Sequence, residues 1–355
     1  MTTNKIAILE LAKSHDECIL SQVKGLKEKG CEIIFCGSKA VFQRNTLFKA
    51  LFDTFYEVNL TGNKKSDFNE IKALNKWLKA EDVEKVICNT AQGNQIRNLA
   101  LISLFNSIQY YGILHTIKKI PDSFTQKIIS LKIKNYFVLN DTLLERIPPQ
   151  KKLTINSFYP LDYPNFDESI EKNGKWRITI IGGVENRRKD LKGFINFAKK
   201  TSKKVQFVFL GFSDFKKEEV IAFKEQIDAL KLNDKILLFN HFVSEEMFDA
   251  YLKETDLILP LVHPNTPSAD EYFNRQISGA INIAFSYKIP MLIHKNYQDW
   301  EDFQTGCIFY DLPEMNSSLG RFFEEHKALK NELKDNPKFS AILQRERFAS
   351  LVINE

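Results

Sequence analysis

The sequence lacks the marks of a membrane-spanning or secreted protein. None of its apolar runs approaches the roughly 18 residues that a membrane span needs. Its first residues, Met1–Leu11, have neither the long apolar core nor the small-residue cleavage site of a signal peptide. Its 355 residues include only five cysteines, which show no metal-ligand spacing and are expected to be free thiols. The sequence therefore predicts a cytoplasmic protein.

Several catalytic motifs are also absent. The chain has no Gly-x4-Gly-Lys-Ser/Thr loop, no Gly-x-Gly-x-x-Gly fingerprint and no Gly-x-Ser-x-Gly elbow, which disfavours ATPases, NAD enzymes and serine hydrolases. Its six histidines are scattered, and it lacks an Asp-x-Asp pair that would hold a divalent ion against a diphosphate. The net charge of +5 comes from lysines spread along the chain, without a nucleic-acid-binding motif. We therefore expect no metal site and no nucleic-acid partner.

What is present is a long alternation of apolar strands and amphipathic helices. In the first half the expected strands are Lys5–Leu9, Glu32–Cys36, Phe55–Val58, Lys85–Cys88, Gln109–Leu114 and Tyr136–Leu139. The expected helices are Glu17–Lys29, Asp67–Lys79, Asn94–Asn106 and Thr125–Ile133, the first with Ser14 as N-cap in a capping box with Glu17. This alternation is typical of βαβ units around a parallel sheet.

A second alternating series follows. Its expected strands are Arg177–Ile181, Gln206–Gly211, Ile236–Phe239, Leu257–Leu261, Met291–Ile293 and Cys307–Tyr310. Its expected helices are Lys189–Thr201, Lys216–Leu230, Ser244–Glu254, Gly279–Ser286, Leu319–Leu333 and Phe339–Ile353. The sequence thus predicts an α/β protein of two doubly wound, Rossmann-like domains, residues 1–156 and 176–335. Residues 157–175 would form the linker, and residues 336–355 a C-terminal helix that packs back on the first domain. In such a pair the ligand cleft is expected between the domains.

The segment Ile178–Gly193 carries the most specific signal. Its sequence, I-T-I-I-G-G-V-E-N-R-R-K-D-L-K-G, runs from a β-branched strand through two glycines into three cations that open a helix. Glycines let a ligand approach the backbone, and the start of a helix presents free N–H groups to an anion. Guanidinium and ammonium groups suit phosphate oxygens. A solvated surface turn is the alternative. The candidate phosphate or diphosphate ligands are Gly182, Gly183, Arg187, Arg188 and Lys189.

A second candidate anion site opens the helix expected at Gly279–Ser286. Ser278 can cap this helix, and Gly279 leaves the first-turn amides open to a ligand; an ordinary capped core helix is the alternative. The preceding polar loop, H-P-N-T-P-S-A-D-E-Y-F, follows a strand of the second domain, where ligands of such sheets bind. It adds the candidates His263, Asn265, Ser268, Glu271 and Tyr272.

The first domain offers candidates for proton transfer. His115 ends the strand I-Q-Y-Y-G-I-L-H and could contact substrate or shuttle a proton, or could simply be a partly buried histidine bonded to backbone. His15 and Asp16 lie at the start of the first helix, where they could contact a second substrate or complete the helix cap. The loop N-T-A-Q-G-N-Q adds Asn89, Thr90 and Gln92 as polar candidates.

Taken together, these segments resemble bacterial glycosyltransferases of the GT-B architecture, of the nucleotide-sugar-dependent group that includes family 4. The resemblance rests on S-H-D-E-C-I-L-S-Q-V-K-G-L, N-T-A-Q-G-N-Q-I-R-N-L-A-L and G-I-L-H-T-I-K-K in the first half. In the second half it rests on I-I-G-G-V-E-N-R-R-K-D-L, L-I-L-P-L-V-H-P-N and S-G-A-I-N-I-A-F-S-Y-K-I-P. These segments occur in order along essentially the whole chain.

The resemblance implies a UDP- or GDP-linked sugar donor in the second domain and a glycan or lipid-linked acceptor in the first. Arg187, Arg188 or Lys189 would match the basic diphosphate ligand, with Ser278 and Gly279 opposite. The segment His241–Ser244, with Phe242 and Val243 at its centre, would hold the nucleobase, and His115 would lie by the donor sugar. No further cofactor is implied. Such an enzyme would work in the cytoplasm or attached to the inner face of the membrane.

The chain departs from the resemblance at one motif. Many retaining members have a Glu-x7-Glu pair before the last Rossmann helix, but here Arg275 and Ile283 occupy those positions, and Glu271 is followed eight residues later by Gly279. Retention and inversion of the sugar therefore both stay open. An inverting enzyme needs a base, for which His15, Asp16 and His115 are the candidates. A nucleotide-sugar epimerase or hydrolase, and a non-catalytic scaffold, are the alternative functions.

Overall fold

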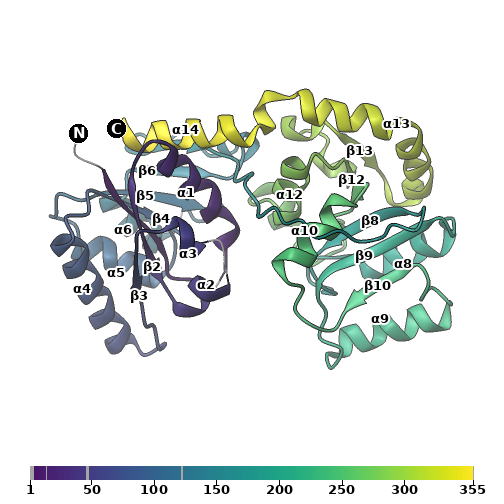
Figure 1. Cartoon of the computed structure of the whole chain (residues 1–355), viewed down its shortest axis with the longest axis horizontal. Coiled ribbons are helices and arrows are strands. Elements are labelled where there is room, and N and C mark those ends of the chain that lie inside the picture. Colours follow the sequence, from purple (N-terminus) through teal and green to yellow (C-terminus); the bar gives the residue numbers. More distant parts are fainter. Residues whose placement is uncertain (1–3, 13, 45–47, 121–122, 355) are drawn as a thin grey trace. The chain divides into compact units, whose positions relative to one another are not determined.

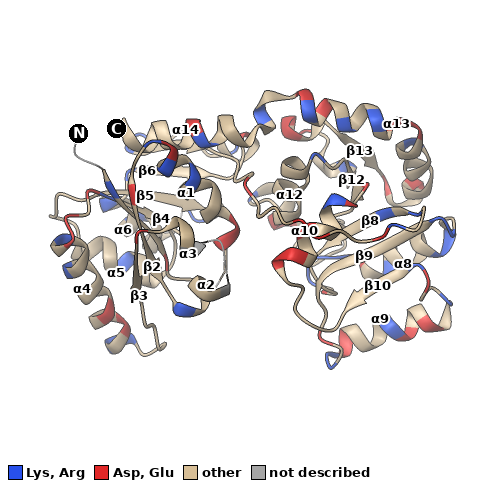
Figure 2. Ribbon diagram, in the orientation of Figure 1, with Lys and Arg blue, Asp and Glu red and all other residues tan. Residues whose placement is uncertain are grey.

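The chain folds into two compact units. A computed structural model describes residues 4–12, 14–44, 48–120 and 123–354. Unit 1 comprises Met1–Tyr163 with Ala341–Glu355, and unit 2 comprises Pro164–Ser340 (Figure 1). Between the last strand of unit 1 and the first strand of unit 2, residues 158–175 contain neither helix nor strand. Lys and Arg residues are spread over both units (Figure 2).

Unit 1 is built on a seven-stranded parallel sheet in the order β3-β2-β1-β4-β5-β6-β7. The central strands are apolar on both faces, as a sheet covered by helices on both sides requires. The strands are β1 (Lys5–Glu10), β2 (Glu32–Gly37), β3 (Thr54–Glu57), β4 (Lys85–Cys88), β5 (Gln109–Leu114), β6 (Asn135–Val138) and β7 (Thr154–Ser157).

The helices of unit 1 connect successive strands, except for the last one. They are η1 (Asp16–Cys18), α1 (Ile19–Glu28), α2 (Lys39–Arg44), α3 (Phe48–Leu51), α4 (Lys64–Ala80), α5 (Asn94–Ile102), α6 (Phe124–Lys132), α7 (Asp141–Glu145) and α14 (Ala341–Ile353). Helix α14 comes from the far end of the chain and packs against α1. Its Phe348 ring lies 4.9 Å from that of Phe137 and 4.7 Å from that of Phe158.

Unit 2 contains a six-stranded parallel sheet in the order β10-β9-β8-β11-β12-β13. The strands are β8 (Trp176–Ile181), β9 (Val205–Phe212), β10 (Ile236–Phe239), β11 (Leu257–Ile258), β12 (Met291–His294) and β13 (Cys307–Tyr310). The helices are α8 (Leu191–Lys200), α9 (Glu218–Ala229), α10 (Glu245–Lys253), α11 (Ala269–Asn274), α12 (Gly279–Tyr287), α13 (Met315–Asp335) and the short η2 (Lys295–Tyr297), η3 (Glu301–Gln304), η4 (Leu312–Glu314) and η5 (Pro337–Phe339).

The predicted fold class is confirmed: each unit is an α/β Rossmann-like domain with a doubly wound parallel sheet. The strands predicted at Lys85–Cys88, Gln109–Leu114, Ile236–Phe239 and Cys307–Tyr310 have the predicted bounds. All five cysteines are free, and four of them are buried.

Many of the other predicted elements begin or end at different residues in the structure, and two of these differences lie beside candidate site residues. Ser14 does not cap the first helix: helical structure begins at Asp16, His15 is the capping residue in a left-handed conformation, and the Glu17 carboxylate faces the His15 ring. The strand predicted at Leu257–Leu261 ends at Ile258, and Leu261 also has a positive φ of 58°. Both departures lie at the carboxyl ends of central strands, next to the loops that contain candidate site residues.

Candidate functional site

The predicted phosphate ligands lie at the topological switch point of unit 2. Chain order reverses between β8 and β11, and ligands of doubly wound sheets bind beside the loops that follow such a pair of strands. We name residues 182–190, which follow β8, the glycine–cation loop. Its Arg187 carbonyl accepts a hydrogen bond from Ser268 N at 3.1 Å, and its Asp190 N donates to Leu261 O at 3.1 Å. The loops after β8 and β11 are therefore bonded together.

The two glycines of this loop are required by the packing of the backbone. Gly182 has a φ of 84°, which side-chain-bearing residues rarely adopt. A Cβ atom on Gly183 would lie 1.9 Å from the carbonyl oxygen of Phe212, and one on Gly211 would lie 2.6 Å from Gly182 Cα. The turn after β8 thus lies directly against the end of β9, and this close approach explains the glycines without a ligand.

The three cations of the loop differ in their surroundings. Arg187 and Arg188 are about half exposed and pair with the Glu185 carboxylate at 3.2 and 3.0 Å. Lys189 is buried, and its ammonium donates to Gly183 O at 3.0 Å. Burial lowers the pKa of Lys189 to about 8. Lys189 therefore supplies a buried positive charge beneath the glycine turn, on which the Glu185 and Glu219 carboxylates act from a distance. The charges of the two arginines are partly neutralised by Glu185.

A buried hydrogen-bonded chain holds the end of the loop. His263 Nδ1 donates to Asp190 Oδ2 at 2.9 Å, and His263 Nε2 accepts from the Tyr310 hydroxyl at 2.5 Å. The other Asp190 oxygen caps α8 by accepting from Gly193 N at 2.9 Å. Although burial acts in the opposite direction, the bonds from His263, Gly193 and Asn265 lower the pKa of Asp190 to about 2. Asp190 is thus a fixed anion that joins α8 to the loop after β11.

Replacing His263 by alanine should destabilise unit 2 by about 2–3 kcal/mol, because it leaves the Asp190 carboxylate and a buried hydroxyl without their partner. The same change at the exposed His241 should stay within about 0.5 kcal/mol. Urea unfolding followed by Trp176 and Trp300 fluorescence, in a Trp77→Phe background, reports on unit 2 alone. Equal effects of the two substitutions would contradict the role given to His263.

The other residues predicted to bind the nucleotide sugar follow further strands of the sheet of unit 2. Ser278 caps α12 by accepting from Ala280 N at 3.4 Å, and no heavy atom lies within 4 Å of a Cβ built on Gly279, so the start of this helix is open. Tyr272 is buried and hydrogen-bonded to Arg188. After β10, the Phe242 ring is 75% exposed and Val243 is buried.

A cavity of about 440 Å³ opens beside the start of α8. Asp190, Gly193 and the exposed Asn265 contribute to its lining, together with Lys192 and residues of η4 and α13. Asn265 also bonds to Asp190. The volume lies within the range of small-molecule sites.

Unit 1 has a second switch point, between β1 and β4, and Asn89 occupies it. This buried side chain donates from Nδ2 to Glu10 Oε2 at 2.6 Å and to His15 O at 2.8 Å, and its Oδ1 accepts from Gln22 at 2.6 Å. Its backbone carbonyl accepts a hydrogen bond from His115 Nε2 at 2.7 Å. Asn89 therefore ties together the carboxyl ends of β1, β4 and β5 and fixes the turn that carries His15.

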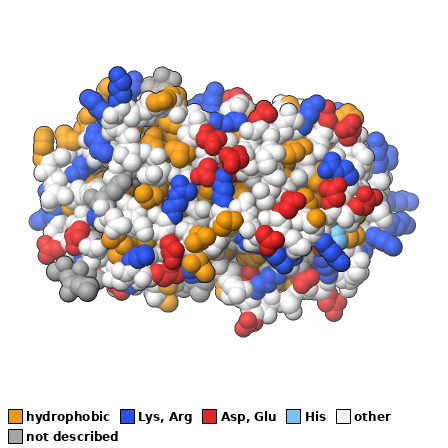
Figure 3. All heavy atoms as spheres, turned by 90° about the horizontal axis from the view of Figure 1, so that it is seen from above, with side chains coloured by type: hydrophobic (Ala, Val, Ile, Leu, Met, Phe, Trp, Pro, Cys, Tyr) orange, Lys and Arg blue, Asp and Glu red, His pale blue; other side chains and the backbone are white. Residues whose placement is uncertain are grey.

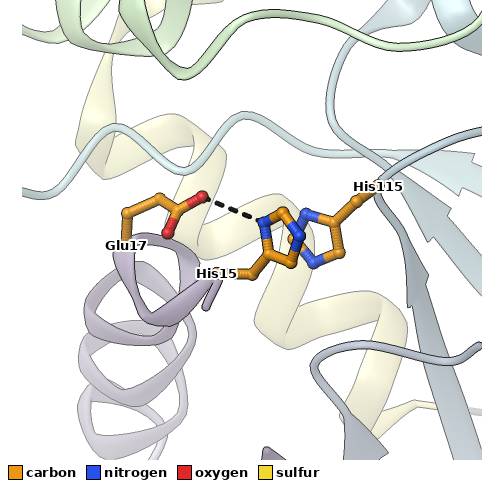
Figure 4. A group of neighbouring side chains, drawn as sticks. All are labelled: His15, Glu17 and His115. Atoms are coloured by element: carbon orange, nitrogen blue, oxygen red, sulfur yellow. Dashed lines mark hydrogen bonds and ion pairs between the residues drawn. The ribbon is translucent and has the colours of Figure 1, made fainter. Parts of the chain in front are cut away.

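The structure brings the predicted catalytic residues His15 and His115 into contact. Their rings stack with centroids 3.8 Å apart and planes 20° from parallel, and the Glu17 carboxylate lies 3.4 Å from His15 Nδ1 (Figure 4). His15 adopts a φ of 71°, and such backbone strain is concentrated at functional sites. Asp16 begins η1 beside it and is partly exposed.

The protonation of these groups follows from their surroundings. Burial and the charge of His15 lower the pKa of His115 to about 4, although its bond to Asn89 acts in the opposite direction. His115 is therefore neutral near pH 7 and donates from Nε2. Burial alone would lower the pKa of His15, but the bond and charge of Glu17, with the charges of Glu10 and Asp16, raise it overall. His15 Nε2 is then the basic nitrogen of the cluster.

The same group could be considered as a metal site, since the ligand atoms of His15, Glu17 and His115 lie within 4.8 Å of one another. A metal ion binds the in-plane lone pairs of imidazoles at about 2.0–2.1 Å. The lone pairs of two stacked, nearly parallel rings do not converge on one point at that distance. The arrangement is better suited to proton transfer, with Glu17 orienting a basic histidine.

Sequence reasoning missed three residues of these clusters. Glu10 and Tyr310 end apolar strands, and Asp190 follows the three cations. A charged residue at the end of an apolar strand is the signal that could have identified Glu10. Burial raises the pKa of Glu10 to about 7, although Asn89, Thr90 and the backbone donate to it. Gln92, another candidate, bonds to the Thr116 carbonyl instead.

No protein-family model matches this chain, and no curated protein matches its sequence. Solved structures similar to it include a glycosyltransferase from Rickettsia africae, at 14% identity over 100% of both chains with a TM-score of 0.72. HepE of Anabaena, crystallised with UDP-glucose, matches at 12% identity over 99% of this chain and 100% of its own, with a TM-score of 0.69.

A putative UDP-N-acetylglucosamine 2-epimerase from Listeria monocytogenes is similarly close, at 10% identity over 99% of this chain and 96% of its own, with a TM-score of 0.68. At these identities the likeness shows the fold alone. The chain thus has the fold of GT-B enzymes, over its whole length. Among the residues that the structure describes, no helix is both long enough and apolar enough to cross a bilayer.

Proposed function

We propose that this protein is a glycosyltransferase that moves a sugar from a nucleoside diphosphate to a glycan or lipid-linked acceptor. One observation supports the proposal above all. In a chain with the GT-B fold, each unit has a chemically distinct cluster at its topological switch point. Unit 2 has a glycine turn with a buried cation, and unit 1 has a basic histidine paired with a carboxylate.

In this proposal unit 2 binds the donor. The Lys189 ammonium and the open amides at the start of α12 neutralise the diphosphate, and they stabilise the charge that develops on it as the sugar leaves. This arrangement needs no metal, because its positive charge is fixed in the protein. The exposed Phe242 ring offers a face on which the nucleobase can stack. A uridine or guanosine diphosphate donor fits these contacts, and the UDP-glucose complex of the similar HepE favours uridine.

Unit 1 then binds the acceptor. A cavity of about 180 Å³ lies at the carboxyl ends of β1, β2 and β3, lined by Leu11, Ala12, Ser38, Val58, Asn59, Leu60 and Thr61. The His15–Glu17 pair follows the same strand β1. In the transfer, His15 Nε2 takes the proton of an acceptor hydroxyl while its oxygen bonds to the anomeric carbon, and the bond to the diphosphate breaks. Glu17 holds the resulting imidazolium in place.

Calorimetry and turnover assays with a panel of UDP- and GDP-sugars test this function. We expect binding of one nucleotide class, and we expect Lys189→Met to weaken it by about 10–100-fold, because a charge-assisted bond to phosphate contributes about 1.5–3 kcal/mol. Lys199→Met, at an exposed position in the last turn of α8, is the matched control and should leave binding unchanged. Failure to bind any nucleotide sugar or nucleoside diphosphate would refute the proposal.

A nucleotide-sugar epimerase is the second candidate. It is favoured by the similarity to UDP-N-acetylglucosamine 2-epimerases at TM-scores up to 0.68 and by the His15–Glu17 pair, which could equally abstract a proton from a sugar. Conversion of a nucleotide sugar in the absence of any acceptor would support the epimerase and count against the transferase. Donor binding without turnover under any condition would instead support a non-catalytic scaffold.

A further inference from the structure

Glu10 is a buried carboxyl group at the end of β1 to which the proposed transfer gives no role. The acidic side chains on the face shown in Figure 3 lie at the surface among lysines and arginines, where water solvates them. Glu10 is instead 0% exposed, and it pairs with no lysine or arginine of the described residues. A carboxylate is costly to bury in this way. Ionisable groups whose pKa is strongly shifted, as burial shifts that of Glu10, are concentrated at functional sites.

The hydrogen bonds of Glu10 reach both ends of the connection between β1 and η1. We name residues 11–15, of which the structure describes all but one, the β1–η1 connection. At its first end, Ala12 N donates to Glu10 Oε1 at 2.6 Å. At its far end, the His15 carbonyl accepts from Asn89 Nδ2 at 2.8 Å, and the same amide group donates to Glu10 Oε2 at 2.6 Å. One carboxylate thus holds the connection directly at Ala12 and, through Asn89, at His15.

The two ends of the β1–η1 connection carry different parts of the proposed site in unit 1. Leu11 and Ala12 contribute to the lining of the acceptor cavity of about 180 Å³. His15, whose ring is the proposed base, has a left-handed backbone with a φ of 71°. Such a conformation persists only where the surrounding structure holds it, and the bond from Asn89 acts directly on this residue. A change at Glu10 therefore acts on the acceptor cavity and on the base together.

The donors around Glu10 require a carboxylate. An ionised carboxyl group accepts hydrogen bonds and donates none, whereas a side-chain amide also donates. Asn89 cannot reverse its own amide, because its Oδ1 accepts from Gln22 at 2.6 Å and its Nδ2 also holds His15. In Glu10→Gln, the new NH2 group would therefore face either the Ala12 amide or the Asn89 amide. Either orientation releases one end of the connection.

We propose that Glu10 is a positioning residue, whose carboxylate holds both ends of the β1–η1 connection and so keeps the acceptor cavity and the His15 base in a fixed place relative to each other. The inference rests on the proposed function, in which these two parts bind the acceptor and take its proton. Glu10 acts through other residues, since its own side chain is fully buried. Its negative charge is also one of those that raise the pKa of His15. The position and the basicity of the base thus depend on the same group.

Glu10→Gln in the full chain tests the inference. We expect kcat for sugar transfer to fall about 10–100-fold, because a displacement of about 1 Å at a reacting group can cost up to about 100-fold in rate. Nucleotide affinity, measured by calorimetry, should not change, since the donor binds in unit 2. Asn75→Ala is the matched control: it removes a buried amide of α4 that accepts from Asn106 Nδ2 at 3.2 Å. It should lower the urea midpoint followed by circular dichroism and leave kcat unchanged.

Titration of the histidine ring signals by nuclear magnetic resonance tests the same inference without any substrate. The His15 signal is identified by its loss in His15→Ala. Glu10→Gln should lower the pKa of His15, because it removes one of the negative charges that raise it. Asn75→Ala should leave this pKa in place, so a general loss of stability cannot produce the shift. The other titratable groups that face the ring are the same in both variants: Asp16, Glu17 and His115.

Glu10→Asp is the second variant, for use if Glu10→Gln does not fold. It keeps the charge but is one methylene group shorter and cannot reach both Ala12 and Asn89, so kcat should fall while the pKa of His15 stays raised. The inference is overturned if either folded variant transfers sugar as the wild type does, or loses nucleotide affinity in step with kcat. An unchanged His15 pKa in Glu10→Gln equally overturns it. Failure of the wild type to bind any nucleotide sugar refutes the proposed function instead, and the histidine titration then decides this inference by itself.

Discussion

Replacement of His15 by alanine should lower kcat/KM for sugar transfer by about 10²–10⁴-fold, since it removes the group proposed to take the acceptor proton. The side chain has both features that a base requires: a carboxylate partner 3.4 Å from Nδ1 and partial exposure of the ring. Initial-rate kinetics with the donor found in the binding assays provide the measurement.

Two further substitutions separate the candidates for the base. His115 is neutral near pH 7 and bonded to the Asn89 carbonyl, so it positions His15 by stacking, and its replacement by glutamine should cost less. Asp16→Asn removes only one of the charges that favour protonated His15 and should have the smallest effect. A larger loss in either of these variants than in His15→Ala would assign the base elsewhere.

The same assignment predicts a pH dependence. A general base acts when it is deprotonated, so the rate should fall as the pH drops through the raised pKa of His15, above its usual value of about 6.5. Glu17→Gln removes the main group that raises this pKa. The acid limb of the kcat/KM profile should then move to lower pH, with Glu10, Asp16 and His115 still facing the ring. An acid limb that stays in place would argue against the pair.

The second large effect is expected at the glycine turn. Gly183→Val should destabilise unit 2 by about 4 kcal/mol, because its Cβ would lie 1.9 Å from a backbone oxygen that no side-chain rotation can move away. Urea unfolding followed by the two tryptophans of unit 2 measures this change. A fully stable Gly183→Val protein would show that the turn after β8 is not held against β9.

Gly279→Ala is the matched comparison. Its Cβ would meet no heavy atom within 4 Å, and it sits in the first turn of α12. Stability should change by less than about 1 kcal/mol, or increase, because alanine restricts the unfolded chain. If the open amides of α12 bind the diphosphate, the added methyl group should nonetheless weaken nucleotide binding. One glycine then reports on folding and the other on ligand binding.

The fold could be predicted because hydrophobic patterning determines it. Strands such as Lys85–Cys88 and Cys307–Tyr310 are short apolar runs between polar segments, and their bounds follow directly from that contrast. The sequence does not predict the short helices α2, α7 and α11, because one or two helical turns are too short to show a periodic spacing of apolar residues. The strand predicted at Leu257–Leu261 is longer than the observed one, because an apolar run gives no sign that Leu261 adopts a left-handed conformation.

The candidate site could be predicted only by residue type and position along the chain. The sequence places His115 at the end of a strand and His15 at the start of the first helix. Their stacking depends on strand order, which brings β1 beside β4 and β4 beside β5. Likewise, three consecutive cations look equivalent in sequence. The structure distinguishes Lys189, which is buried, from two arginines that share Glu185, because the loop turns one side chain inward.

The path of helix α14 has a consequence for how the protein is made. Its residues supply the ring of Phe348 to unit 1, and the carbonyl of Val352 accepts bonds from Lys85 and Tyr111. On a ribosome, these residues emerge only after the whole of unit 2 has been synthesised. Unit 1 is therefore the first to begin synthesis and the last to be completed. Until α14 is made, the apolar surface that α14 covers stays exposed, which makes the nascent chain a candidate for chaperone binding.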